Sequence, residues 1–139
     1  MFQATNWIAA AFDAKGWKYD TSENPGKSSR LVTRWNGENI QTVELAYIST
    51  DDDNDVAVRC FCIAQVPKAK TEAVQAVLNQ LNNKYRYAKF VLDDDQDVNC
   101  EYDLPIATEA VGACCTEMCM RLVNIIDESY PEIMKALWA

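Results

Sequence analysis

The amino-acid sequence predicts an α+β domain in which helices pack on an antiparallel sheet of about five strands. Between Val74 and Tyr85, apolar residues recur at intervals of three and four residues, which is the spacing of an amphipathic helix. From Val98 to Leu104, apolar and polar residues alternate strictly, which is typical of a half-buried strand. Over the whole chain the expected order of elements is α-β-β-β-α-β-β-α, a pattern that favours helices packed against an antiparallel sheet.

The chain begins with an expected helix over residues 4–15. Thr5 or Asn6 can cap its first turn, and Gly16 is placed to end it, because glycine readily adopts the left-handed conformation that follows many helices. Residues 22–29, SENPGKSS, are the most loop-like segment of the sequence, with Asn-Pro-Gly as the core of a turn.

Three strands are expected next. Residues 31–35 form the first, and Asn36-Gly37 predicts a tight hairpin turn, since both residues tolerate positive φ. The return strand is expected over residues 39–49, and an acidic connection follows at residues 51–55. Residues 56–66 then alternate with one apolar face and one mixed face, so this strand is expected to be central in the sheet.

The second half of the chain is expected to hold a helix, a two-stranded hairpin and a final helix. Pro67 stops the preceding strand, and Pro105 ends the hairpin and can open the last helix, because its missing N–H is not needed there. The turn of the hairpin is the acidic segment 93–97. The expected ranges are 68–84 for the helix, 85–92 and 98–104 for the strands, and 105 or 107 to 126 for the last helix.

The last helix carries an apolar stripe at helical spacing, which is expected to face the core. Tyr130-Pro131 interrupts the pattern, and residues 132–138 can add one or two terminal turns. The expected core positions of this helix are Ala107, Val111, Cys114, Met118, Leu122 and Ile125.

Residues 79–105 resemble the signature region of the YbjN family of small bacterial domains. In this family a helix ends in an asparagine-rich segment, here LNQLNNKY, and a strand with lysine and phenylalanine follows, here AKFVLD. After an acidic turn, which here lacks the glycine often found in the family, a further strand, DVNCEYDLPI, leads into the last helix. The resemblance covers residues 69–126 and implies a fold like that of type III secretion chaperones. It implies no catalytic residue, because the family's motifs are structural.

Length and composition indicate one globular domain over residues 1–139. The net charge of −8 argues against sequence-independent nucleic-acid binding, which depends on lysine and arginine. No apolar run is long enough to cross a bilayer, and no basic segment precedes the first apolar residues, so we expect a cytoplasmic protein with no membrane partner. The chain has no histidine, the commonest general base and metal ligand, and we expect neither enzymatic activity nor a cofactor.

The acidic turn is a candidate cation site. Asp93, Asp95 and Asp97 match the alternating oxygen ligands at the start of a calcium loop. The match fails further on, because Val98 stands where that loop needs a glycine and Leu104 where it needs a glutamate. A solvated hairpin turn is therefore the better interpretation.

The cysteines are a second candidate for metal binding. Thiols at Cys60, Cys62, Cys115 and Cys119 could in principle hold zinc. The first two lie in the apolar series of a core strand, and free cysteine behaves there as a small hydrophobic residue, so we favour packing.

The remaining candidate site is a protein-binding surface. Trp35 adjoins the expected hairpin turn and Arg34 shares its strand, and both residue types are enriched at binding hot spots. We expect partner contacts from Trp35, Arg34, Tyr47 and Phe61 on strand faces, whereas the alternative for Trp35 is simply to cover one edge of the sheet.

The expected function is that of a chaperone- or adaptor-like binding module. It would act as a homodimer on a polypeptide partner, either through an exposed sheet edge that accepts an extended strand or through an apolar groove beside the helices. The alternative is a regulatory domain that responds to a small ligand or a metal through its acidic loops or thiols.

Overall fold

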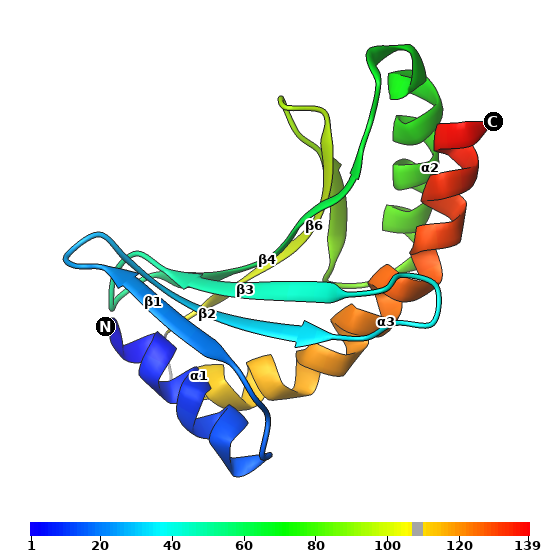
Figure 1. Cartoon of the computed structure of the whole chain (residues 1–139). Helices are drawn as coiled ribbons and strands as arrows, with labels where there is room; N and C mark the ends of the chain where they lie inside the picture. The colour runs from blue at the N-terminus through cyan, green and yellow to red at the C-terminus, as the bar shows by residue number, and fades with distance from the viewer. Residues whose placement is uncertain (107–109) are drawn as a thin grey trace.

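The computed structural model describes residues 1–106 and 110–139 and confirms the α+β class. Six antiparallel strands form one sheet in the order β1-β2-β3-β4-β6-β5, and the helices lie along one face of this curved sheet (Figure 1). The helices are α1 (Gln3–Ala14), α2 (Thr71–Lys84), which follows a short 3-10 turn at Lys68–Lys70, and α3 (Val111–Trp138). The strands are β1 (Asp20–Asn24), β2 (Ser28–Trp35), β3 (Val43–Ser49), β4 (Asp55–Gln65), β5 (Lys89–Leu92) and β6 (Asp97–Pro105).

The core lies between the helices and the sheet face that they cover. Leu31 of β2 and Leu45 and Tyr47 of β3 point into it and are buried. Ile8 and Phe12 of α1 fill the same layer, and the ring of Phe12 stands edge-on to that of Tyr47 with 5.4 Å between centroids. Burial of each such side chain stabilises the fold by about 1.5–3 kcal/mol, so this layer is the main source of stability.

Strand β1 lies partly in the segment that the sequence predicted as a loop, which is why the sheet has one strand more than expected. The turn after it is closed by a hydrogen bond from the N–H of Lys27 to the carbonyl of Asn24 (2.9 Å), with Gly26 at a φ of 74°. All residues of β1 are exposed, so no apolar alternation marks it in the sequence. Backbone pairing with β2 alone defines this strand.

A bulge in β4 interrupts the alternation expected over residues 56–66, which is otherwise confirmed by the burial of Val56, Val58, Cys60, Ala64 and Val66. Pairing with β6 is regular up to Cys60 and resumes at Ala64, with four residue steps on β4 opposite two on β6 (60 to 64 against 100 to 98). The extra residues turn Cys62 outward, where it is exposed at a φ of 50°. The side-chain oxygen of Asn99 accepts the N–H of Cys62 at 2.8 Å and so satisfies the irregular backbone.

Helix α3 is one helix of 28 residues that continues through Pro131, where the sequence predicted an interruption. The expected stripe is confirmed at Val111 and Leu122, which are buried. It is wrong at Cys114, which is exposed, and Met118 and Ile125 are only partly buried; Cys115 and Cys119 face the core instead. Gly112 sets this phase, because a Cβ there would lie 2.7 Å from the carbonyl oxygen of Trp7 in α1. The buried positions are Val111, Gly112, Cys115, Cys119, Leu122, Val123, Ile126, Ser129, Ile133 and Ala136.

The expected core position Ala107 lies outside the described residues. Within residues 1–106 and 110–139, no helix combines the length and the apolar character that a membrane span requires.

The connection between β2 and β3 is a loop of residues 36–42 that wraps around Asp127 of α3, and it replaces the expected two-residue turn. The Asp127 carboxylate accepts the backbone N–H groups of Glu38 (3.1 Å), Asn39 (2.8 Å) and Ile40 (3.0 Å). A Cβ at Gly37 would overlap this carboxylate, so glycine is required there for space, and its φ is not positive. We call Asp127 and residues 36–42 the Asp127 latch.

Pro131 explains why the backbone carbonyl of Asp127 also takes part in the Asp127 latch. Proline has no N–H, so it cannot donate to the carbonyl of Asp127 four residues earlier, as an ordinary helical residue would. The side-chain amide of Asn39 donates to that carbonyl instead, at 3.1 Å. The loop thus supplies the hydrogen bond that the proline removes, and the helix continues to Trp138.

Replacing Asp127 by alanine should lower the free energy of unfolding by about 1–2 kcal/mol, because three backbone N–H groups then bond only to water. Gly37→Ala should also destabilise. The loss in the double variant should be smaller than the sum of the two, since removing the Asp127 carboxylate relieves one clash of the new Cβ, while the clash with the Ile40 carbonyl oxygen (2.6 Å) remains. Urea denaturation followed by circular dichroism measures these values. Asn124→Ala, at an exposed site of α3, is the control and should change little; strictly additive losses would contradict the proposed contact.

The fold should lose stability in acid but not between pH 7 and 5. Backbone N–H groups hold three carboxylates at low pKa, and such a carboxyl contributes stability above its unfolded pKa of about 3.9 and loses it as the pH falls through the lower folded value. The carboxyls with lowered pKa are those of Asp51, Asp93 and Asp127, bonded chiefly to the N–H groups of Asn54, Asp97 and Ile40. Melting temperatures measured from pH 7 to 2.5 should be level to about pH 5 and fall below about pH 4, less steeply in Asp127→Ala. A fall that begins near pH 6 would show that another group is responsible.

Candidate functional site

The four residues predicted to contact a partner do not share one surface. Tyr47 is 1% exposed beneath the helices and is not accessible. Trp35 is half-buried on the same side of the sheet, where its ring stands edge-on to Trp17 at 5.2 Å. Arg34 and Phe61 lie on the opposite, open face of the sheet and are exposed. Arg34 and Phe61 are therefore the most accessible of the four.

The open face of the sheet carries its own polar contacts. Arg34 pairs with Asp20 (2.8 Å) and Glu44 (3.5 Å), and the guanidinium of Arg30 lies 5.9 Å from the centre of the Phe61 ring. Exposed pairs of this kind contribute little to stability. They leave Phe61, which is 50% exposed, as a large apolar side chain in reach of solvent.

The acidic turn is held by its own backbone. The Asp93 carboxylate accepts the N–H groups of Asp95 (2.9 Å) and Asp97 (3.0 Å) and the side-chain amide of Asn99 (2.8 Å). The Asp97 carboxylate accepts a hydrogen bond from the Cys62 thiol at 3.3 Å, and this contact raises the pKa of that thiol. In the described part of the chain, no three acidic, cysteine or histidine side chains are grouped to hold a metal ion.

The cysteines divide into buried and exposed groups, and the four thiols considered for zinc are not gathered at one site in the described structure. Burial raises the pKa of Cys60 to about 12 and those of Cys100, Cys115 and Cys119 above the usual range. A thiol with such a pKa remains protonated at neutral pH, so these cysteines are packing residues without nucleophilic character.

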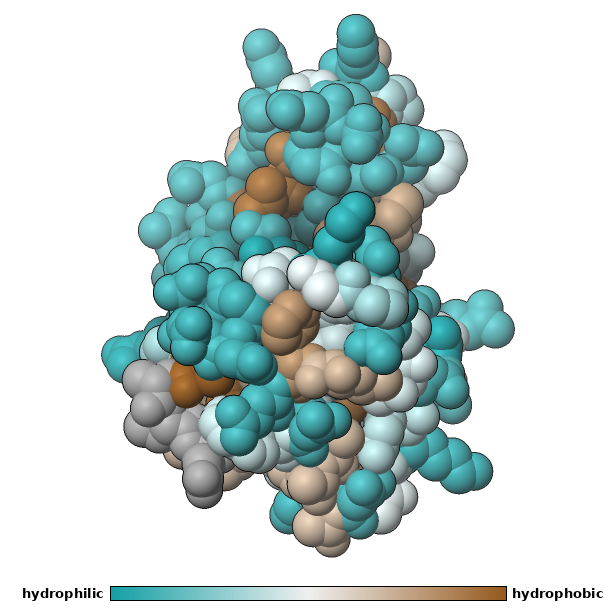
Figure 2. Space-filling view, turned by 90° about the vertical axis from the view of Figure 1, so that its left-hand side faces the viewer, coloured by the Kyte–Doolittle hydropathy of each residue, from teal (hydrophilic) through white to brown (hydrophobic). Residues whose placement is uncertain are grey.

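Hydrophilic residues cover most of the face seen in Figure 2, and hydrophobic residues reach that surface only in small patches between them. Scattered apolar residues of this kind are usual on soluble proteins and indicate no binding site by themselves.

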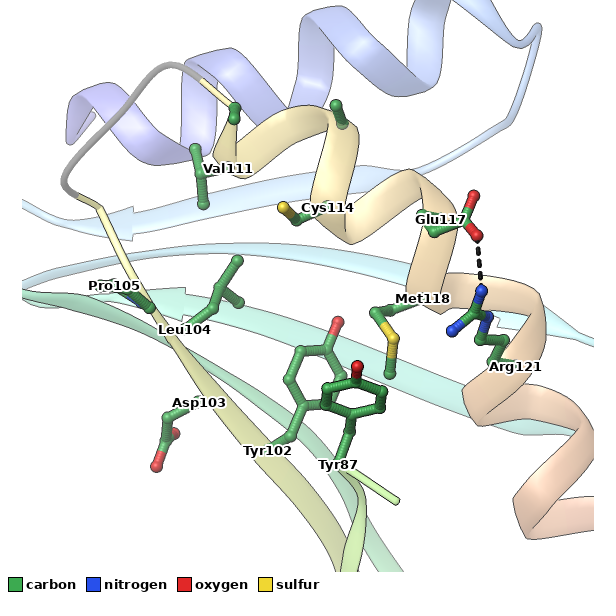
Figure 3. Close-up of a pocket in the computed structure, with 12 residues that line it drawn as sticks. Tyr87, Tyr102, Asp103, Leu104, Pro105, Val111, Cys114, Glu117, Met118 and Arg121 are labelled. Atoms are coloured by element: carbon green, nitrogen blue, oxygen red, sulfur yellow. Dashed lines mark hydrogen bonds and ion pairs between the residues drawn. The ribbon is translucent and has the colours of Figure 1, made fainter. Parts of the chain in front are cut away.

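A groove of about 730 Å³ lies between the end of β6 and the first half of α3 (Figure 3). Tyr102 and Leu104 point from β6 toward the helix, whereas Asp103 between them points away from it. Val111 and Met118 face them from α3. The other lining residues are Tyr87, Pro105, Ala110, Ala113, Cys114, Glu117 and Arg121. Apolar side chains therefore form most of this groove.

Two polar features stand in the groove. The hydroxyl of Tyr102 is buried and finds no hydrogen-bond partner among the described residues, and burial raises its pKa far above the ordinary value, so it remains a donor. Leaving such a group unpaired costs about 1–3 kcal/mol. On α3, Glu117 and Arg121 form an ion pair at 2.7 Å. The hydroxyl is thus an unused donor that lies beneath the surface of the groove, without solvent contact of its own.

Sequence reasoning did not identify the groove. The alternation of residues 98–104 correctly placed Tyr102 and Leu104 on one face of a strand, but it could not show which of the apolar residues on that face α3 leaves uncovered. The half-buried state of both residues depends on the path of the helix across the sheet. No local pattern in the sequence reports that path.

Comparisons with known proteins agree with the fold. The family YbjN, described as "Putative bacterial sensory transduction regulator", matches residues 5–134. The crystal structure of YbjN from E. coli, described as "a putative transcription regulator", is similar with a TM-score of 0.61 and 17% sequence identity over 92% of each chain. No curated protein matches the sequence. Because the family match spans almost the whole chain, the protein belongs to the YbjN family, whose description is that of a regulator.

Proposed function

We propose that this chain is a non-enzymatic, adaptor-like regulatory module that binds a segment of a partner polypeptide in the groove between β6 and α3. The supporting observation is that an apolar groove coincides with an unpaired strand edge. β5 pairs only with residues 98–101 of β6, so residues 102–105 meet no strand on that side in the described structure. Peptide-binding proteins use both features, the edge for backbone hydrogen bonds and the groove for side chains.

The dimensions and chemistry of the groove suit a peptide. Its volume of about 730 Å³ falls within the range of about 300–1,000 Å³ that is usual for ligand sites. Met118 offers a flexible, polarisable contact of the kind found at adaptable binding surfaces. Tyr87, which is 65% exposed and lines the groove, provides an aromatic anchor.

A second candidate occupant is a small apolar ligand with one hydrogen-bond acceptor. The unpartnered hydroxyl of Tyr102 favours it, since a ligand that displaced the side chains covering this buried group would recover the lost hydrogen bond. The chain would then be a ligand-responsive regulator that uses the same groove.

We also propose that the chain acts as a homodimer in the cytoplasm. All six cysteines are free thiols, as expected in a reducing compartment. We place Phe61, which is 50% exposed on the open face of the sheet, in the interface with the second copy. Light scattering after gel filtration should give twice the chain mass at micromolar concentration, and Phe61→Glu should give a single chain. A single-chain mass for the unaltered protein over this range would contradict the dimer.

Peptides selected on the chain test groove binding directly. A phage-displayed library of random peptides, panned on the immobilised full chain, should yield a family of apolar sequences. Met118→Asp should weaken their binding at least about tenfold, because it places a charge against the apolar segment. The readout is fluorescence anisotropy with labelled peptide.

Met120→Asp is the matched control, since Met120 is exposed on the same helix and does not line the groove. Both variants should melt within a few degrees of the unaltered chain. Peptides that bind Met118→Asp as tightly as Met120→Asp would place the site elsewhere. A library that yields no binder would contradict the polypeptide proposal and favour the small ligand.

A further inference from the structure

We infer that the occupant of the groove is an extended polypeptide segment that joins the sheet as a short added strand and pairs with β6 at Asp103. This inference rests on the proposed function and specifies the conformation and composition of the partner. It is carried by the hydrogen-bonding phase of β6, by the course of the chain before β5 and by the way the structure closes the neighbouring edge.

The alternation of hydrogen-bonded pairs between β4 and β6 decides which backbone groups of β6 face the open edge. The N–H of Ile106 donates to the carbonyl of Asn54 at 3.0 Å. Hydrogen-bonded and non-hydrogen-bonded pairs alternate along antiparallel strands, so Leu104 is hydrogen-bonded to β4. Asp103, opposite Ala57, therefore directs its N–H and C=O away from β4 and toward the edge.

The chain turns away from β6 just before it would reach Asp103. β5 pairs with β6 no further than Glu101, and the same register would place Tyr87 opposite Asp103. Tyr87 instead has a φ of 68°, and the N–H of Ala88 donates to the carbonyl of Arg86 at 2.8 Å in a tight turn. The place beside Asp103 that a longer β5 would occupy therefore holds no strand among the described residues.

The neighbouring edge is closed. The N–H of Phe90 in β5 donates to the side-chain oxygen of Asn82 (2.7 Å), and the side-chain nitrogen of Asn82 donates to the Phe90 carbonyl (3.0 Å). One side chain of α2 thus occupies both backbone groups that a visiting strand would use there, a common protection of edges. At the far edge of the sheet, all residues of β1 are polar and exposed, so this edge has no apolar side chains beside it. Asp103 marks the edge that adjoins an apolar groove.

The groove defines the side chains of the partner. Successive residues of an added strand point to opposite faces, so every second side chain would enter the groove beside Leu104 and Met118 and should be apolar. The alternate side chains would face the open side of the sheet near the Asp103 carboxylate, which is 59% exposed. Together with the net charge of −8, this carboxylate favours lysine or arginine at those positions.

Two variants at one position test the added strand. Asp103→Pro removes the outward N–H and keeps the bonds to β4, because proline is tolerated where the N–H faces an open edge. Asp103→Ala removes the same carboxylate and its ion pair with Arg59 (2.8 Å) but keeps the N–H. The probe is the tightest peptide selected from the library on the unaltered chain. Asp103→Pro should weaken its binding about tenfold, and Asp103→Ala by less than about threefold.

Modified peptides provide a readout that leaves the protein unchanged. N-methylation of one peptide residue at a time should weaken binding at two residues that lie two positions apart and not at the residue between them, because among residues 102–105 of β6 only the carbonyls of Asp103 and Pro105 face the open edge. Equal affinity of the two Asp103 variants, or an N-methyl series without this two-residue spacing, would overturn the added strand. If Met118→Asp still abolished binding, groove binding itself would stand.

The remaining outcomes also decide the question. Selected peptides with apolar residues three and four apart would indicate a helical occupant and overturn the inference. A dimer that dissociates in Asp103→Pro but not in Asp103→Ala would assign the edge to a second copy of this chain and overturn a foreign partner. A library without binders would remove the proposed function and this inference together.

Discussion

The Asp127 latch fixes where α3 crosses the sheet, and the groove exists because of that crossing. Asp127 can accept three backbone N–H groups only because Gly37 leaves room for its carboxylate. Pro131 frees a carbonyl that Asn39 then uses. Gly37 and Asn39 of the β2–β3 loop thus join it to Asp127 and Pro131 in the second half of α3. The close contact of Gly112 with α1 fixes the start of α3. Between Gly112 and Asp127, the helix passes the end of β6, and the space left between the helix and this strand is the groove.

Sequence patterns predicted the elements whose periodicity reflects burial, and they failed where a tertiary contact decides the backbone. Helices α1 and α2 and strands β3, β4 and β6 fall within a few residues of their expected ranges. Strand β1 carries no apolar alternation, because both of its faces are exposed. Asn36-Gly37 has the composition of a tight turn, yet the glycine serves the approach of Asp127. The bulge at Cys62 depends on the side chain of Asn99 across the sheet, which a one-dimensional pattern cannot report.

The site shows the same limit. An exposed sheet edge and an apolar groove beside a helix were expected as alternative routes to a partner, and the structure places the two at one position. The candidate contact residues were chosen because their amino-acid types are common at binding sites. Amino-acid type does not show which face of the sheet a side chain occupies, and Tyr47 is buried in the core. The edges of β5 and β6 differ in their free backbone groups. The side chain of Asn82 hydrogen-bonds both the N–H and the C=O of Phe90 in β5, whereas no described residue hydrogen-bonds those of Asp103 in β6.

An open edge of β6 is the claim on which the proposed function and the added strand both depend, and amide hydrogen exchange measured residue by residue by NMR tests it most directly. In the free protein the amides of Tyr102 and Leu104, bonded to β4, and that of Glu101, bonded to β5, should exchange slowly. The amide of Asp103, which lies among them in the same strand, should exchange as fast as that of an exposed loop residue. Protection of Asp103 equal to that of its neighbours would show that the edge is already occupied and would contradict the account.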